Sequence, residues 1–170
     1  MRSTDGRICS KIPTSVDDSV RDGPLDCARG VQRGNVLTGG CFCGQVRYRI
    51  TAPLGGGRSC HCSRCRKAFS GPGSAYSEVV PGSFSWVSGE NNLIHYESTP
   101  GWGLCFCKMC GSTLCGTHDG KVHGVTLGTV DGDPGVHIEM HIFVDSKAPW
   151  DHIGGDAPQY AEFPPQAKPI

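Results

Sequence analysis

Apolar and polar residues alternate along several short stretches of the chain. In residues 44–51 (GQVRYRIT), Val46, Tyr48 and Ile50 alternate with two arginines. Because successive side chains of a strand point to opposite faces, this pattern is typical of a strand with one buried face. Comparable segments, each bounded by Gly, Pro, Asn or Asp, follow at residues 74–80, 83–88, 93–98, 121–130 and 137–145. The pattern predicts a mainly β protein.

Little helix is expected, and only one segment favours it, the turn or two after Cys65 over residues 66–70. The chain has 25 glycines, and a glycine inside a helix costs about 1 kcal/mol relative to alanine. Residues 1–36 show no sustained period and mix charges with Pro, Gly and Ser, which predicts a disordered or loosely packed extension. Residues 37–170 then form one domain, a length that suits a single core.

Charge and hydropathy exclude some partners. The 16 basic and 16 acidic residues cancel, so no overall field attracts nucleic acid or an anionic membrane surface. No apolar run approaches the roughly 18 residues that span a bilayer, and the N-terminal region lacks the apolar core of a secretory signal. We therefore expect a soluble, cytoplasmic protein without nucleic-acid or membrane partners. The sequence does not indicate an oligomeric state.

The cysteines carry the strongest chemical signal. There are 11 of them, an odd number at tight spacing and without an export signal, which favours metal binding over a disulfide framework. A disulfide across one intervening residue, as between Cys41 and Cys43, would also strain the backbone.

Nine of the cysteines lie in or beside three motifs. The motif cysteines are Cys41 and Cys43 (C-x-C), Cys60, Cys62 and Cys65 (C-x-C-x-x-C), and Cys107 and Cys110 (C-x-x-C). An extended C-x-C places two sulfurs on one face of a strand, and a C-x-x-C in a tight turn also brings two sulfurs together. A glycine follows Cys43 and Cys110, and it frees the backbone so that amide N–H groups can point at the thiolates.

Counting sulfurs divides the motifs into four plus three. Joining the middle motif to either flanking pair would give five sulfurs, one more than a tetrahedral zinc needs. We therefore assign one closed, structural zinc to Cys41, Cys43, Cys107 and Cys110. The second zinc is held by Cys60, Cys62 and Cys65, with one corner open. An open corner is typical of catalytic zinc, because solvent or substrate can enter there.

Alternatives to this division remain. A fourth protein ligand would close the second site, and the candidates are His61, His118, His123, Cys105 and Cys115; His61 points away if its motif is extended. Alternatively, Cys105 pairs with Cys107 and leaves Cys110 free. An iron–sulfur cluster is a further possibility, although none of its usual four-cysteine spacings occurs.

The same motifs resemble a known family. GGCFCGQVRY, CHCSRCRK and FCKMCGSTL, in this order, and the later segment HIFVDSKAPWDHI are similar to the glutathione-dependent formaldehyde-activating enzyme family, whose relatives include centromere protein V. The resemblance covers residues 37 to about 165. It implies a β-tent type of domain with two zinc sites, whose ligand sets map onto the same four and three cysteines. The implied activity is the condensation of glutathione with formaldehyde to S-hydroxymethylglutathione, classed as a carbon–sulfur lyase acting in reverse.

We therefore expect a zinc-dependent carbon–sulfur lyase that forms thiol–aldehyde adducts from small substrates. The second zinc would bind a thiol, lower the thiol pKa and present the thiolate to the aldehyde. Candidate substrate-binding residues are the bases Arg66 and Lys67 after the middle motif, and Lys147 and Trp150 in an irregular stretch. Together with Arg64, the two bases could offset the cluster charge or hold the carboxylates of a glutathione-like tripeptide. The sequence does not single out a proton carrier: His118, His123, His137 and His141 all lie in or beside predicted strands, where an exposed or buried structural histidine is the ordinary expectation. The alternative function is a non-catalytic, zinc-stabilised binding module. We expect Phe42, Phe69 and Trp102 to pack against the metal sites.

Overall fold

The computed structural model describes residues 36–165 and confirms a mainly β fold with little helix. The predicted extension, residues 1–36, lies outside the described residues except for Val36, and the first strand begins at Leu37. Within the described range, no helix has the length and apolar character needed to cross a membrane.

The described residues form ten strands, one α-helix and three short 3-10 turns. The elements in chain order are β1 (Leu37–Gly40), β2 (Arg47–Ile50), β3 (Gly57–Cys60), α1 (Ser63–Phe69), β4 (Ser74–Glu78), β5 (Phe84–Ser88), η1 (Glu90–Asn92), β6 (Leu93–Thr99), β7 (Trp102–Cys107), β8 (Thr113–His118), β9 (Lys121–Thr126), η2 (Leu127–Thr129), β10 (Ile138–Ile142) and η3 (Val144–Ser146).

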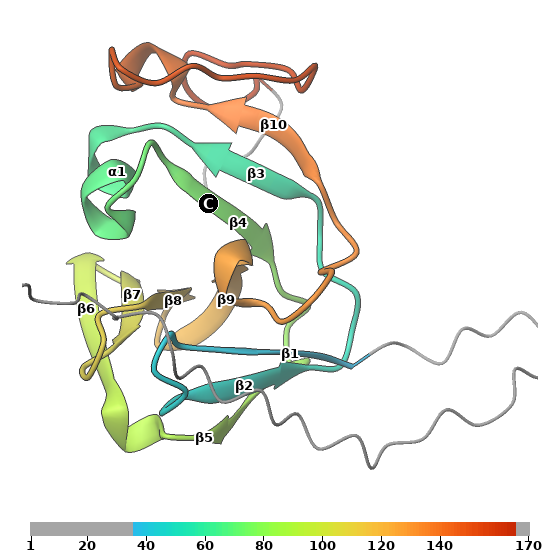
Figure 1. Ribbon diagram of the computed structural model, residues 1–170, viewed down its shortest axis with the longest axis vertical. Coiled ribbons are helices and arrows are strands. Elements are labelled where there is room, and N and C mark those ends of the chain that lie inside the picture. Colours follow the sequence, from blue (N-terminus) through green and yellow to red (C-terminus); the bar gives the residue numbers. More distant parts are fainter. Residues whose placement is uncertain (1–35, 166–170) are drawn as a thin grey trace, which may run out of the picture. The chain divides into compact units, whose positions relative to one another are not determined.

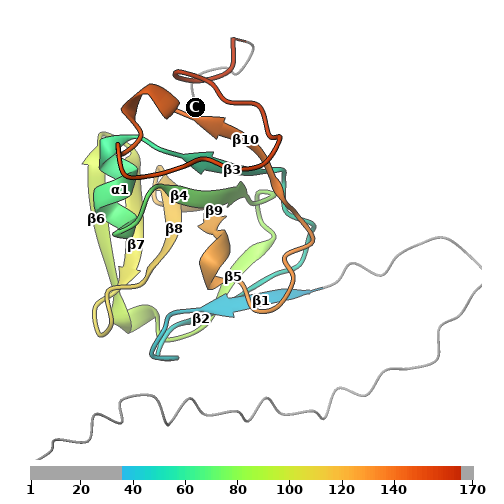
Figure 2. The same cartoon turned by 45° about the horizontal axis from the view of Figure 1, so that its top comes forward.

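The strands form two sheets. One has three strands in the order β1-β2-β5, and the other has seven in the order β10-β3-β4-β9-β8-β7-β6. Among the described residues every neighbouring pair is antiparallel except β10 and β3. Figures 1 and 2 show the smaller sheet at the bottom of the view and β10 at the opposite end. The larger sheet carries Cys60 at the end of β3 and Cys107 at the end of β7.

Each of the six segments with an alternating pattern contains a strand, so that part of the prediction is confirmed. Four strands, β1, β3, β7 and β8, were not predicted. Their sequences are LTGG, GRSC, WGLCFC and TLCGTH. Glycines and cysteines interrupt the apolar alternation there, so sequence alone gives no period-two signal.

The helix begins earlier than predicted. It starts at Ser63, before Cys65, because Cys62 acts as the N-cap: its Sγ accepts a hydrogen bond from the Cys65 backbone N–H at 3.4 Å. A side chain that accepts from this N–H satisfies one of the free donors of the first turn. Ser70 ends the helix in a left-handed conformation, with φ of 51°.

The core contains the residues that the alternation in residues 44–51 placed inside. Val46, Tyr48 and Ile50 are at most 1% exposed, whereas Arg49 faces solvent. Full burial of such a side chain contributes roughly 1.5–3 kcal/mol. Leu114 and Val125 of the larger sheet are also fully buried in the same cluster. The core therefore lies where the two sheets meet.

Tyr48 is the largest fully buried side chain, and its surroundings are specific. Its ring stacks on Phe84 with centroids 5.2 Å apart, and its hydroxyl lies 2.9 Å from the Thr129 hydroxyl. Burial raises the pKa of Tyr48 to about 12. The ring passes over Gly39 so closely that a methyl group there would overlap the ring and the Thr129 carbonyl oxygen.

We predict that Gly39→Ala destabilises the domain by about 1–3 kcal/mol, the usual cost of overpacking a core. Urea unfolding would measure the change in the free energy of unfolding. Gly128→Ala is the matched control, since a methyl group at Gly128 meets no atom within 4 Å. Equal stability of the two variants would contradict the close packing of Tyr48 on Gly39.

Candidate functional site

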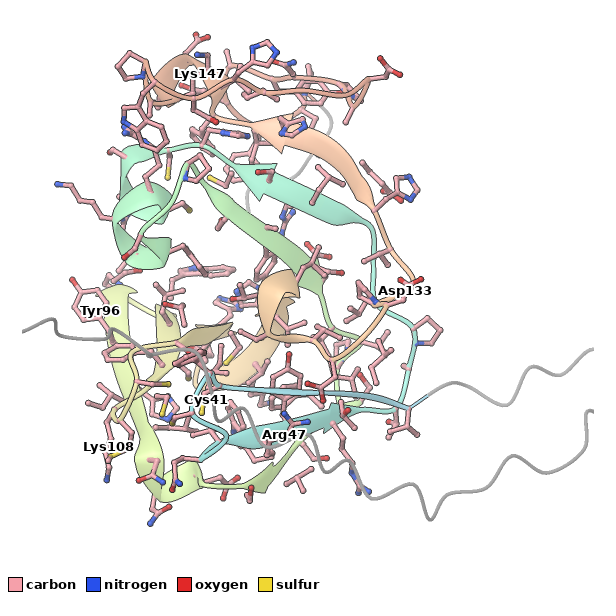
Figure 3. The ribbon with its side chains drawn as sticks, viewed as in Figure 1. Cys41, Arg47, Tyr96, Lys108, Asp133 and Lys147 are labelled. Carbon is pink, nitrogen blue, oxygen red and sulfur yellow. The ribbon has the colours of Figure 1, made fainter. Side chains whose placement is uncertain are left out.

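Four cysteine sulfurs from two distant segments converge. Cys41 follows β1 and Cys43 lies in the next turn, while Cys107 ends β7 and Cys110 lies in the turn after it. The four sulfurs all lie within 4.8 Å of one another. Figure 3 shows Cys41 close to the end of β1, beside the larger sheet. The structure thus brings together the four cysteines that the sulfur count had grouped.

The C-x-C pair reaches this geometry differently from our expectation. It is not an extended strand but a turn, closed by a 3.0 Å hydrogen bond from the Gly44 N–H to the Cys41 carbonyl. Gly44 has φ of 76°, a conformation that glycine adopts without strain. The turn brings Cys41 Sγ and Cys43 Sγ to 3.5 Å. A tight turn, rather than strand alternation, therefore pairs the two sulfurs.

The spacing of these sulfurs fits a tetrahedral zinc. Sulfurs 2.3 Å from a central zinc lie about 3.8 Å apart at the corners of a tetrahedron. Cys41 and Cys43 are separated by 3.5 Å, and Cys43 and Cys107 by 3.9 Å. The Val46 backbone N–H donates to Cys41 Sγ at 3.2 Å, as thiolate ligands in proteins commonly require. The donor set suits a structural zinc.

The second cluster is local in sequence. Cys60 is the last residue of β3, Cys62 caps α1, and Cys65 lies in the first turn of the helix. Their three sulfurs lie within 4.8 Å of one another. In residues 36–165, no further His, Cys, Asp or Glu ligand atom joins this group. The cluster can hold a metal ion with three thiolates.

The thiols of this cluster share their protons unequally. A hydrogen bond from the Cys60 thiol lowers the pKa of Cys65 most strongly. Burial opposes this effect, but the Ser74 hydroxyl and other neighbours lower the pKa further, to about 6. The same hydrogen bond to Cys65, followed by burial, raises the pKa of Cys60. Three thiols this close can all ionise only beside a cation, since thiolates repel one another.

The candidate fourth ligands have other partners. His61 is 4% exposed and directs Nε2 at His141 Nδ1, 3.0 Å away, with Nδ1 3.5 Å from an Asp151 oxygen. His61 therefore faces β10 rather than solvent. His118 stacks on Trp102 at 3.9 Å.

Cys105 and Cys115 are buried and face each other across β7 and β8. Cys105 Sγ also lies 2.9 Å from His95 Nδ1. Both thiols are thus engaged in the interior of the larger sheet, away from the groups of three and four sulfurs.

A cavity of about 880 Å³ opens beside the three-cysteine cluster. Its wall includes Cys60, Cys62 and Cys65, and it is bounded by α1, β3, β4, β6, β7, β8, β9 and the end of β10. Hydrogen bonds between elements close the wall near the helix: Thr113 Oγ1 donates to the Ala68 carbonyl at 3.0 Å. Figure 1 shows α1 between the ends of β3 and β4 and the ends of β6 and β7.

The cavity is positively charged and aromatic. Its basic residues are Arg58, Arg64 and Lys67, and no aspartate or glutamate of the described chain lines it. Its aromatic residues are Phe69, Tyr76, Tyr96, Trp102, Phe106, His123, Phe143 and Phe163. The volume is that of a small-molecule site, and the charge favours an anionic ligand.

The substrate residues nominated from sequence are divided between two hollows. Lys67 lines both the large cavity and a smaller one of about 290 Å³, whose wall also includes Arg66 and Trp150. The Arg66 Nε is buried without a hydrogen-bond partner among the described residues. Lys147 lines neither hollow; its Nζ donates to the Asp151 carbonyl at 3.0 Å, and Figure 3 shows it at the end of the domain far from Cys41.

Sequence reasoning missed Arg58 and Tyr76, which both line the large cavity. Arg58 lies two residues before Cys60 on β3, and Tyr76 is its partner on β4. Residues two apart on a strand share a face, so the position of Arg58 was recoverable if β3 had been recognised. No local signal marks Tyr76, because only strand pairing brings it to the cavity.

The expectation for the aromatic residues was partly wrong. Phe69 and Trp102 line the cavity, but Phe42 is 89% exposed and does not pack against the four sulfurs. The turn directs the side chain of Phe42 away from the four sulfurs, although Cys43 beside it is also exposed.

This chain is similar to the following known proteins. The family model described as "GFA: Glutathione-dependent formaldehyde-activating enzyme" matches residues 36–146. A Halomonas elongata protein named "Putative glutathione-dependent formaldehyde-activating enzyme" is 29% identical over 130 residues, covering 69% of this chain and 81% of that relative. The crystal structure of a Rhodobacter sphaeroides protein is similar with a TM-score of 0.47 and 24% identity, covering 72% of this chain and 98% of that one.

We predict that Cys110→Ser destabilises the domain more than Cys62→Ser does. Cys43 and Cys107 are 64 residues apart, and closing a loop of that length is worth about 4 kcal/mol, whereas the three-cysteine cluster closes only a short segment. The free energy of unfolding of both variants, measured with and without a chelator, would show this. Equal losses from the two substitutions would argue against a structural role peculiar to the four-sulfur cluster.

Proposed function

Because the chain belongs to the glutathione-dependent formaldehyde-activating enzyme family, we propose that it is a zinc-dependent carbon–sulfur lyase. It joins a small anionic thiol, glutathione or a close analogue, to an aldehyde, and it cleaves the adduct in the reverse direction. The observation that carries the proposal is a three-sulfur cluster in the wall of a basic cavity, with no fourth ligand among residues 36–165.

Two zinc ions per chain are part of this proposal. One is structural and is held by Cys41, Cys43, Cys107 and Cys110. The other is held by Cys60, Cys62 and Cys65, and a zinc there would supply a Lewis-acid position that favours the thiolate form of a bound thiol. The sulfur spacings of both clusters support these assignments.

The reaction itself needs few groups. In the forward direction the thiol loses its proton, its sulfur forms a bond to the carbonyl carbon, the C=O π bond breaks, and the oxygen gains a proton. The protein must hold the thiol and the aldehyde in contact and move one proton. Bringing two reactants into contact is a large part of such a rate enhancement.

The basic residues of the cavity are suited to hold the thiol. Three thiolates on a divalent zinc give the cluster a net charge of about −1, and glutathione adds its own carboxylates. Arg58, Arg64 and Lys67 offset this charge and can donate charge-assisted hydrogen bonds to carboxylates. Arg64 is already held in place, since its Nη2 donates to the Ser98 carbonyl at 3.2 Å. Arg58 pairs with Glu78 at 2.9 Å.

One observation favours a second function, a non-catalytic, zinc-stabilised binding module. Phe42 and Met109 are 89% and 64% exposed, and they lie in the two turns that carry the four-sulfur cluster. The two turns are linked, because the Phe42 N–H donates to Ser112 Oγ at 3.0 Å. Exposed apolar side chains on linked turns can contact a partner protein.

We predict that the zinc-loaded protein accelerates the interconversion of formaldehyde plus glutathione and S-hydroxymethylglutathione. Exchange NMR would measure the rate, with no-enzyme and metal-stripped controls because the adduct also forms spontaneously. Cys62→Ser should lower the catalysed rate about 100-fold or more, since changing a residue that merely supports a metal ligand already costs about 10–100-fold and Cys62 is proposed as a ligand itself. Glutathione binding without any acceleration would favour the binding module instead.

Lys67→Met tests the recognition of the anionic thiol. We expect KM for glutathione to rise about threefold to tenfold, the effect of losing one partly exposed ionic hydrogen bond, while KM for the uncharged thiol 2-mercaptoethanol stays unchanged. Lys121→Met, outside both hollows, is the control and should change neither value. Parallel changes for the two thiols would exclude Lys67 as a carboxylate partner.

A further inference from the structure

The proposed reaction requires a proton carrier, and the cavity contains a pair of residues with the right chemistry. Tyr76 on β4 and His123 on β9 both line the cavity that includes the three cysteines. The Tyr76 hydroxyl oxygen lies 2.5 Å from His123 Nδ1 and 3.2 Å from Nε2, so Nδ1 is the nearer partner. A phenol and an imidazole in hydrogen-bond contact can pass a proton between them.

Strand pairing places Tyr76 and His123 close enough to the three cysteines for one small molecule to contact both groups. Ser74 is the partner of Cys60 in the β3–β4 register, and both residues line the cavity. Tyr76 lies two residues further along β4, on the same face, which is a distance of about 6.8 Å along the strand. A substrate thiol that contacts the sulfurs therefore has its reacting atoms within reach of the Tyr76 hydroxyl.

Two glycines make room for the pair. A methyl group at Gly124 would overlap the Tyr76 hydroxyl, and one at Gly116 would lie 2.8 Å from His123 Nε2. The His123 ring is also held by Trp102, whose ring meets it edge-on with centroids 5.2 Å apart. The backbone and one aromatic neighbour thus define where both polar side chains lie.

The charges around the pair favour a neutral imidazole and a protonated phenol. Burial, followed by the positive charge of Arg58, lowers the pKa of His123, with a smaller opposing effect from Glu78 and a further lowering by His118. Burial raises the pKa of Tyr76, and Arg58, 5.2 Å from the centre of its ring, opposes this. At neutral pH His123 can therefore accept a proton and Tyr76 can donate one.

We propose that Tyr76 and His123 form the proton relay of the thiol–aldehyde reaction, with Tyr76 as the catalytic residue that contacts the aldehyde oxygen and His123 as the positioning residue behind it. This inference rests on the proposed function. It assigns a role to two side chains that the cysteine motifs do not include, and it explains why both face the same cavity as the three sulfurs.

The relay returns every proton that it takes up. In the forward direction the thiol gives its proton to the Tyr76 hydroxyl, which passes one to the unprotonated ring nitrogen of His123. His123 becomes an imidazolium. The thiol sulfur then bonds to the carbonyl carbon as the C=O π bond breaks. Tyr76 donates its hydroxyl proton to the resulting alkoxide oxygen and regains one from His123. Both residues end as they began, and the cleavage direction reverses each transfer.

Tyr76→Phe is the direct test, because it removes the hydroxyl and keeps the ring. We expect kcat for S-hydroxymethylglutathione cleavage to fall about 10²–10⁴-fold, the usual contribution of general acid–base catalysis. Glutathione binding measured by calorimetry, and KM, should change less than about threefold. Tyr160→Phe, outside the cavity lining, is the matched control and should retain the wild-type kcat.

His123→Asn is the second variant and keeps the test valid if Tyr76→Phe does not fold. In the wild-type protein kcat for S-hydroxymethylglutathione cleavage should fall as pH decreases through the pKa of His123, which lies below its ordinary value of about 6.5. The reason is that the imidazolium cannot accept the proton that the adduct hydroxyl loses. His123→Asn should have a lower kcat without this acid limb. An NMR titration of the His123 ring gives a readout independent of activity: its midpoint should rise in Tyr76→Phe, where the hydroxyl no longer donates to the neutral ring.

The outcomes separate the two proposals. An active wild-type protein, together with a folded Tyr76→Phe variant of equal kcat or a His123→Asn variant that keeps the acid limb, would overturn the relay alone. A zinc-loaded wild-type protein that binds no thiol and accelerates nothing would overturn the proposed function, and the relay would fall with it.

Discussion

Thiols held within 4.8 Å of one another can all lose their protons only beside a cation, because thiolates repel at that distance. This constraint applies at the place where the two sheets meet. Cys41 and Cys43 extend from the three-stranded sheet, and Cys107 and Cys110 from the seven-stranded sheet. Whatever neutralises these sulfurs also determines how the sheets are held together. The core around Tyr48 lies in the same junction, so packing and sulfur chemistry support the same arrangement.

The larger sheet forms most of the cavity beside the three sulfurs. Strand β3 ends at Cys60, and its partner β4 carries Ser74 and Tyr76 on the face that lines the cavity. Helix α1 begins at the capping Cys62, so the turn that orients the second and third sulfurs is also the start of the segment that brings Arg64 and Lys67 to the cavity. Sulfur ligands and basic side chains therefore share one short stretch of chain. The C-x-C-x-x-C motif therefore indicates the position of both the three sulfurs and the neighbouring basic side chains.

Sequence patterns predicted the features that depend on neighbouring residues and missed several that depend on residues far apart in the chain. Alternation of apolar residues predicted β2 and the inward position of Tyr48, since one strand's period depends only on neighbouring residues. It failed for β3 and β8, whose glycines and cysteines carry no apolar period. It also failed for the shape of the Cys41–Cys43 segment, where a turn at Gly44 replaces the expected strand.

The sequence by itself determined the mainly β class, the family and the cysteine motifs, because spacing within a motif limits how far apart neighbouring sulfurs can lie. It indicated the division into four and three cysteines but left alternatives, and the tertiary structure brought Cys41 and Cys43 to Cys107 and Cys110. The sequence could not determine the lining of the cavity. Arg58, Tyr76 and His123 meet there only because β3, β4 and β9 pair in one register, and Lys147 is kept away from it by its own position beyond β10. These positions depend on contacts between residues far apart in the chain. The free energies of those contacts come from packing and burial, which no local sequence pattern contains.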